Sequence, residues 1–177
     1  SFFLSIILIL LKVGDEKAAI KKIPWGVLIL ISGVSVLMNL TKTMGGIDLL
    51  ADILSSMMND KTAPSIIGLT AGLMSWFSSA NGVVFPTLIP TVSKIVADIG
   101  GNISAIELII AIVGGATVAG ISPLSTGGSL ILAAYSQETD STEKDEQNLF
   151  AKLFITSFFV VIIITIFAFL GIFKIFS

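Results

Sequence analysis

The chain has 177 residues, of which 54% are hydrophobic and 12% are charged, with a formal net charge of −2. Soluble domains carry about 25% charged residues, so this composition predicts an integral membrane protein. The chain has no Cys, His or Arg, which excludes disulfides, thiolate and imidazole chemistry, and a bidentate guanidinium clamp for anions.

Residues 1–11 are apolar from the first position and are interpreted as the end of a transmembrane helix. Because no charged leader or cleavage site precedes Ser1, we expect a fragment whose N-terminal part is missing. Residues 24–40 form the next predicted transmembrane helix, with Trp25 at its mouth as interfacial Trp residues lie. Residues 47–58 are amphipathic and short, so we expect an interfacial helix flat on the membrane surface.

Residues 64–97 are predicted to form a re-entrant hairpin with its tip at 78–82, in the sequence Ser-Ser-Ala-Asn-Gly. Asn-Gly is a strong turn dipeptide. Each arm is near 15 residues, whereas a spanning helix needs roughly 20. The alternative is one long span with a kink.

Residues 104–135 are predicted to form a transmembrane helix that is broken at 120–128, where Pro123 and a Gly-Gly pair interrupt the helical pattern. An acidic loop is expected at 137–147, and residues 148–173 form a last full span. In lipid, irregular backbone persists only where it is buried in protein or lines a wet cavity. Paired breaks therefore point to a transporter's binding site, although each alone fits a packed polar turn or a flexible hinge.

At the hairpin tip, two half-helix ends would meet at one place. The N-terminus of the outgoing arm offers free N–H groups, and the C-terminus of the incoming arm offers carbonyls that suit Na⁺. Asn81 supplies both a donor and an acceptor beside the hydroxyls of Ser78 and Ser79 and the backbone of Gly82. The second break adds the hydroxyls of Ser125 and Thr126 and the flexible backbone at Gly127.

The other polar residues in apolar surroundings have simpler interpretations. Glu107 lies one turn into its helix and is expected at the membrane interface, and Lys94 with Asp98 is expected to form a surface pair. No Asp, Glu or Lys lies deep in a predicted span, which counts against a proton-relay carboxylate.

Three features together resemble the ion transporter superfamily, nearest to dicarboxylate carriers and divalent-anion:sodium symporters. They are the sequence of residues 24–30, the hairpin with Asn81 nine residues before Pro90, and the Ser-Pro-Leu-Ser-Thr-Gly-Gly break at 122–128. The resemblance covers essentially the whole chain. It implies an all-α membrane fold that is the C-terminal one of two inverted repeats, working by alternating access in a homodimer.

The resemblance also implies roles for individual residues. In sodium-coupled relatives the hairpin tip carries Ser-Asn-Thr, and Asn81 matches the Asn, whereas Ala80 and Gly82 replace the other two. Ser78 and Ser79 are near enough to substitute. Thr126 matches the Thr of the second unwound loop, and carbonyls near Ser79 and Ser125 match Na⁺ ligands.

We therefore expect secondary transport of small organic anions, with dicarboxylates as the first substrates to test and Na⁺ or H⁺ as the coupling ion. No enzyme signature, other cofactor or nucleic-acid partner is expected, and the location is a bacterial or archaeal inner membrane. One alternative is an inorganic-anion transporter or cation/proton antiporter of the same superfamily. The other, of a different class, is a structural membrane subunit without transport, whose two breaks would share no cavity.

Overall fold

The computed structural model describes residues 17, 20–21, 25–100, 103–138 and 142–176, so the expected helix end at 1–11 lies outside the described residues. The chain divides into two compact units, Ser1–Gly33 and Val34–Ser177. The described residues form helices and turns, with no strand among them. The predicted all-helical class is therefore confirmed for this part of the chain.

Helix α3 (Trp25–Thr43) begins in the first unit and continues into the second. It extends past the predicted end at residue 40, and in its last turn the Thr41 and Thr43 hydroxyls donate to the Leu37 and Asn39 carbonyls, each at 2.9 Å. These bonds satisfy hydroxyls that would otherwise compete with the helix backbone. Along its second-unit part, Val36, Leu37 and Leu40 are exposed, as in a helix that faces lipid.

Helix α4 (Gly46–Ser56) is amphipathic, as the sequence indicates, but its apolar face packs against protein. Ala51 and Leu54 are buried in one core with Val92 and Ile95 of helix α7 (Val92–Ile99). The expectation that this face rests on the membrane surface overlooked that partner. Whether the helix lies at the membrane interface stays a prediction.

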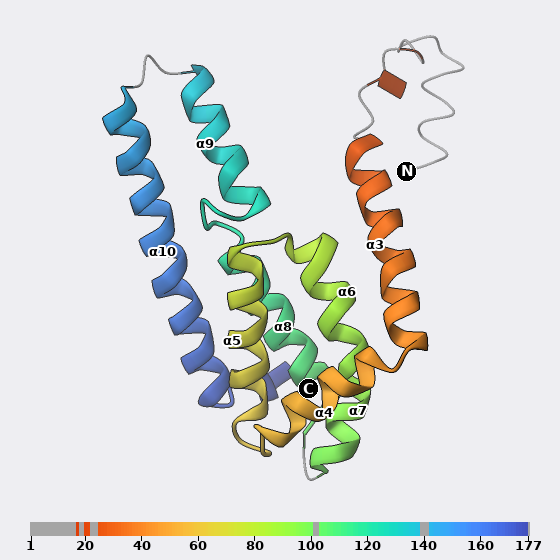
Figure 1. The fold of residues 1–177 in the computed structure, drawn as a ribbon. Helices are drawn as coiled ribbons and strands as arrows, with labels where there is room; N and C mark the ends of the chain where they lie inside the picture. The colour runs from red at the N-terminus through yellow and green to blue at the C-terminus, as the bar shows by residue number, and fades with distance from the viewer. Residues whose placement is uncertain (1–16, 18–19, 22–24, 101–102, 139–141, 177) are drawn as a thin grey trace, which may run out of the picture. The chain divides into compact units, whose positions relative to one another are not determined.

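Helix α5 (Ala63–Trp76) and the segment after it run in opposite directions and form a hairpin (Figure 1). The returning arm comprises a π-helical turn η1 (Ala80–Val84), helix α6 (Phe85–Leu88), a 3₁₀ turn η2 (Ile89–Thr91) and α7. It is helical throughout Ala80–Ile99, a stretch long and apolar enough to cross a membrane.

This second arm is longer than the predicted 83–97, so the argument from short arms applies only to α5. The arm can stay helical through both prolines because they lie where the helical hydrogen-bonding pattern changes, between π-helical, α-helical and 3₁₀ segments. Pro86 lies in the first turn of α6, and Pro90 lies in η2. A proline in a first turn costs no intrahelical hydrogen bond.

The hairpin packs on helix α8 (Ala105–Ala119) with unusually close backbones. A Cβ atom built on Gly115 would lie 2.2 Å from the Gly68 carbonyl oxygen. Buried Ser75 of α5 donates a hydrogen bond of 2.7 Å to the Ala116 carbonyl. Small residues therefore allow the contact, as at other membrane helix crossings.

After α8 the chain unwinds, resumes as α9 (Thr126–Glu138) and returns as the long helix α10 (Glu143–Phe169), which a 3₁₀ turn η3 (Ile172–Phe176) follows. Helix α10 begins at Glu143, before the predicted residue 148. The reason is a capping box, in which the Thr142 hydroxyl and the Asp145 carboxylate bond each other's backbone N–H groups. The predicted end at 173 was late, since Gly171 leaves the helix with φ 74°.

We propose that the hairpin is re-entrant, because its two arms run antiparallel and α5 has only 14 residues. Single cysteines at Thr62 and Gly100 of the full-length protein should then react with a membrane-impermeant thiol reagent from the same side. Labelling from opposite sides would contradict this topology.

Candidate functional site

The two irregular segments of the chain meet at one cavity of about 400 Å³. It lies between the hairpin tip and the break that separates α8 from α9. The lining residues are Ser78, Ser79, Ala80, Asn81, Thr117, Gly120, Ile121, Ser125, Thr126, Gly127 and Leu130. Residues from two separate segments therefore surround one space.

At the hairpin tip, the serine hydroxyls bind backbone. Ser78 donates to the Met74 carbonyl at 2.7 Å, which satisfies the C-terminal end of α5. Ser79 accepts from the Gly82 amide at 3.1 Å and so caps the π-helical turn that follows. Turns of this kind occur frequently at functional sites.

At the second break, Ser125 holds the unwound backbone together. Its buried hydroxyl has one proton and two acceptors within reach, the Gly120 carbonyl at 2.6 Å and the Ser122 carbonyl at 2.7 Å, and it accepts from the Gly128 amide at 3.2 Å. The Ser122 hydroxyl, also buried, donates to the Trp76 carbonyl at 3.2 Å. This last bond joins the break to the end of the hairpin's first arm.

Three polar side chains of the cavity lack such bonds. Within the described residues, the Asn81 amide and the Thr117 and Thr126 hydroxyls have no hydrogen-bonding partner in the protein, and all three residues are exposed. Thr126 also begins α9, where the Gly128 and Ser129 amides bond to Ser125 and the Thr126 and Gly127 amides have no intrahelical acceptor. These groups remain available to a ligand.

Six of the seven predicted site residues line this cavity: Ser78, Ser79, Asn81, Ser125, Thr126 and Gly127. The exception is Gly82, whose buried amide is bonded to Ser79. Thr117 was missed by the sequence reasoning, although it lies one helical turn before Gly120, where the break begins. A polar residue one helical turn before a break is expected to face the same space as the break, so this spacing could have identified Thr117.

The described lining residues are uncharged, so this cavity would hold an anion through dipoles rather than through a lysine. Its hydroxyl, amide and backbone oxygens are of the kind that Na⁺ accepts, which is consistent with the predicted ligands near Ser79, Asn81 and Ser125. No cluster of three carboxylates, His or Cys residues occurs in the described part of the chain. The described residues therefore offer no site for a divalent metal that needs three such ligands.

Glu107, which was predicted to lie at the membrane interface, is buried in the protein. Only 1% of the residue is exposed, and neither carboxylate oxygen has a hydrogen-bonding partner among the described residues. The prediction used only the distance from the helix end and did not anticipate burial by other segments, and the depth of Glu107 in the membrane stays a prediction. Neighbouring segments cover this turn of α8, and sequence position alone does not show them.

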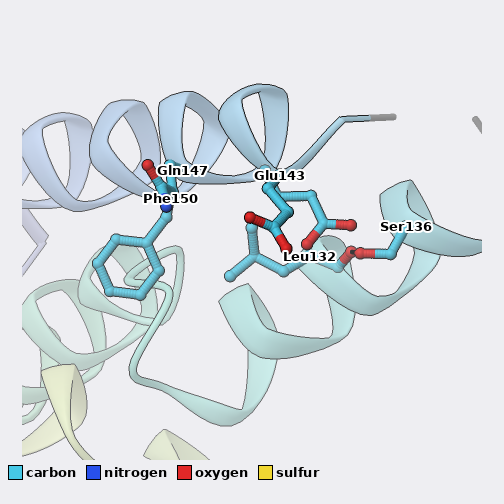
Figure 2. Close-up of a pocket in the computed structure, with 6 residues that line it drawn as sticks. Leu132, Ser136, Glu143, Gln147 and Phe150 are labelled. Atoms are coloured by element: carbon cyan, nitrogen blue, oxygen red, sulfur yellow. Dashed lines mark hydrogen bonds between the residues drawn. The ribbon is translucent and has the colours of Figure 1, made fainter. Parts of the chain in front are cut away.

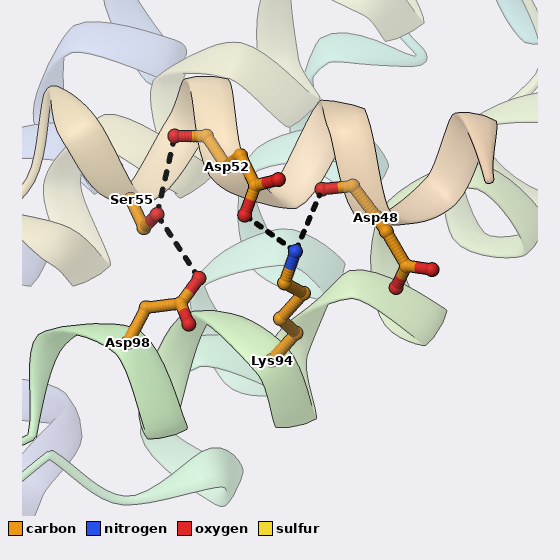
Figure 3. A network of polar contacts seen from close by, with 5 residues as sticks. All are labelled: Asp48, Asp52, Ser55, Lys94 and Asp98. Atoms are coloured by element: carbon orange, nitrogen blue, oxygen red, sulfur yellow. Dashed lines mark hydrogen bonds and ion pairs between the residues drawn. The ribbon is translucent and has the colours of Figure 1, made fainter.

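Lys94 also differs from the expectation of a pair with Asp98. It forms an ion pair with Asp52 of α4 and donates to the Asp48 carbonyl at 3.3 Å. Asp98 instead accepts from Ser55 at 3.3 Å (Figure 3). We call these five residues the α4–α7 clamp, because they link the surface of α4 to the hairpin's second arm.

Another cavity, of about 430 Å³, lies between α9 and α10. Glu143, Gln147 and Phe150 of α10 face Leu132 and Ser136 of α9 across it (Figure 2). Its charged lining residues are the acidic Glu143 and Glu146, which repel an anion. It is therefore a poor candidate for the anion site.

Comparison with protein families gives one finding over the whole chain. Residues 1–177 match the family model described as citrate transporter. The chain matches no curated protein and no solved structure.

Proposed function

Because the chain belongs to the citrate transporter family, we propose that it forms one half of the binding site of a secondary transporter for citrate and related small organic anions, coupled to Na⁺ or H⁺. Membership makes it an integral membrane protein and a member of the ion transporter superfamily. The bacterial or archaeal inner membrane remains the proposed location.

The cavity shared by the two breaks is the observation that carries this proposal. Unsatisfied backbone costs several kcal/mol per group in lipid, so two breaks in one membrane domain have a physical reason to share a polar space. A volume of about 400 Å³ suits a small ligand. Its three unengaged polar side chains, Asn81, Thr117 and Thr126, give that ligand specific partners.

The chemistry of these partners fits a carboxylate. The Asn81 amide and the two threonine hydroxyls can donate hydrogen bonds, and the start of α9 adds N–H groups and the positive end of a helix dipole. Carbonyls at the hairpin tip suit a coupling cation beside the anion. A bound cation would supply the positive charge that the uncharged lining lacks.

The remaining parts of the proposal concern groups beyond this cavity. A second inverted repeat would supply a matching hairpin, and the site would be complete at the interface of the two repeats. Alternating access would then follow from movement of one repeat against its surroundings, in a homodimer embedded in the lipid bilayer. The exposed side of Asn81 and Thr126 leaves room for such a second half.

The shared cavity weighs against a structural subunit without transport, since that alternative has no need for the two breaks to meet. It also weighs against a cation/proton antiporter at this cavity, because no carboxylate is among its described lining residues. Glu107, the buried carboxylate, lines a different cavity.

Uptake measurements with the full-length protein in liposomes test the proposal. We expect accumulation of labelled citrate or of malate, succinate or malonate under an inward Na⁺ gradient or an inward proton gradient, and none in liposomes without protein. Failure to transport any of these anions under either gradient would favour the antiporter or the subunit without transport.

A further inference from the structure

Glu107 lies in the first turn of α8, at the opposite end of that helix from the candidate anion site. It is 1% exposed, and both carboxylate oxygens are buried without a hydrogen-bonding partner. The anion-binding chemistry proposed above does not use this residue. Its state of ionisation therefore needs its own explanation.

A cavity of about 440 Å³ adjoins Glu107. Lys61, which precedes α5, and Lys174 of η3 line it together with residues 168–171, which comprise the end of α10 and the turn after it. Two lysines and the buried glutamate therefore line one cavity. It is distinct from the anion cavity, with which it shares no described lining residue.

The charged residues of the surrounding helices show which cations could pair with an ionised Glu107. Glu107 is the only charged residue of α8, and residues 168–171, at and after the end of α10, are uncharged. The charged groups of α7, Lys94 and Asp98, are bonded to Asp52 and Ser55 of α4. Lys61 and Lys174 are thus the described cations that line the cavity beside Glu107.

An ionised carboxylate buried without a hydrogen bond is far more costly than the neutral acid. No described atom donates a hydrogen bond to Glu107, so its burial favours the neutral acid in this conformation, and the positive charge of Lys174 opposes that preference more weakly. Ionisable groups inside membrane segments commonly mark ion or proton pathways. A neutral acid next to a basic cavity has a place to release its proton.

We propose that Glu107 is a proton-binding site, which is occupied by one proton in this conformation and releases it into the cavity lined by Lys61 and Lys174. On release, the O–H bond of the carboxyl group breaks, water in the cavity accepts the proton, and the carboxylate that remains is paired by a lysine ammonium. The site would exist whichever anion the protein carries, so it does not depend on the proposed substrate.

Infrared spectroscopy of the full-length protein in lipid tests the protonation state directly. We expect a carbonyl band of a neutral carboxyl group near neutral pH that Glu107→Gln removes. Glu143→Gln is the matched control, because Glu143 is an exposed acid in the first turn of α10 and should leave the band in place. A spectrum without a band that depends on Glu107 overturns the proposal.

Thermal unfolding in detergent at a series of pH values gives a second test. If only the folded state keeps Glu107 neutral, unfolding releases a proton, and the stability of wild type falls as pH rises above the ordinary range of a carboxyl group. The limit for one group is a tenfold change in the unfolding equilibrium per pH unit. Glu107→Gln should lose this dependence and equal or exceed wild type at high pH.

The competing possibility is a permanent ion pair of Glu107 with Lys174 or Lys61. In that case Glu107→Gln and the corresponding lysine-to-methionine variant should both destabilise the protein at every pH, and the proposal would be wrong. A Glu107→Gln variant with the same stability and pH dependence as wild type would also overturn it. These outcomes are independent of whether citrate is transported.

Discussion

Replacing Asn81 by alanine should reduce anion uptake by roughly tenfold to a hundredfold at limiting substrate, while expression is retained. Asn81 is the only amide at the hairpin tip, and its side chain lines the cavity without a partner among the described residues. A hydrogen bond to a charged group contributes about 1.5–3 kcal/mol, and each 1.4 kcal/mol is a tenfold change in affinity. Because no fold contact is lost, the damage should appear in transport alone.

The measurement is initial uptake of labelled anion by the reconstituted full-length protein over a range of substrate concentrations. Asn148→Ala is a matched control, since it removes an exposed amide from α10 outside the cavity. Thr126→Val should cause a milder loss, because backbone N–H groups at the start of α9 remain. Unimpaired uptake by Asn81→Ala in a protein that transports normally would place the anion elsewhere.

Replacing Gly115 by alanine should destabilise the packing of the hairpin on α8 by about 1–3 kcal/mol, the usual cost of overpacking. The added Cβ would lie 2.2 Å from the Gly68 carbonyl oxygen and 3.0 Å from the Gly68 carbonyl carbon. Both atoms belong to backbone, so no side chain can rotate away. Relief requires α5 and α8 to separate, which would also strain the Ser75 bond to Ala116.

Gly114 provides a control on the adjacent residue. A Cβ there would meet only the Ile164 Cγ2 atom, at 3.8 Å, which is an ordinary contact. Alanine at 114 should therefore be tolerated or slightly stabilising, since alanine favours helix more than glycine does. Comparison of the melting temperatures and expression levels of the two variants checks this, and equal behaviour would show that the helices do not cross as closely as described.

The approximate positions of the two breaks were predictable from sequence because their signals are local. The exact residues differ from the prediction: the first break lies at 77–79, with Asn81 and Gly82 already in the π-helical turn η1. The second break lies at 120–125 around Pro123, with Gly127 and Gly128 already in the first turn of α9. That these breaks line a common cavity is a tertiary fact, which the cost of irregular backbone in lipid made foreseeable. Helix bounds were less predictable, since the start of α10 depends on a side-chain cap at Thr142.

The roles of individual hydroxyls were not predictable in the same way. Ser79 and Ser125 have the same chemistry as Thr126, but in the structure their hydroxyls cap a turn and brace an unwound loop, respectively. A short polar side chain near a break can bind either backbone or ligand. Only the three-dimensional arrangement separates the two uses, as it also does for the burial of Glu107.

The α4–α7 clamp would transmit a movement of the hairpin's second arm to helix α4. Because Lys94 and Asp98 are both bonded to α4, the hairpin's second arm and α4 should move together as one rigid body. Leu49 and Ile53 lie on the exposed side of α4, away from its buried face. A fluorophore attached there would report a displacement that begins at Asn81 without touching the anion cavity itself.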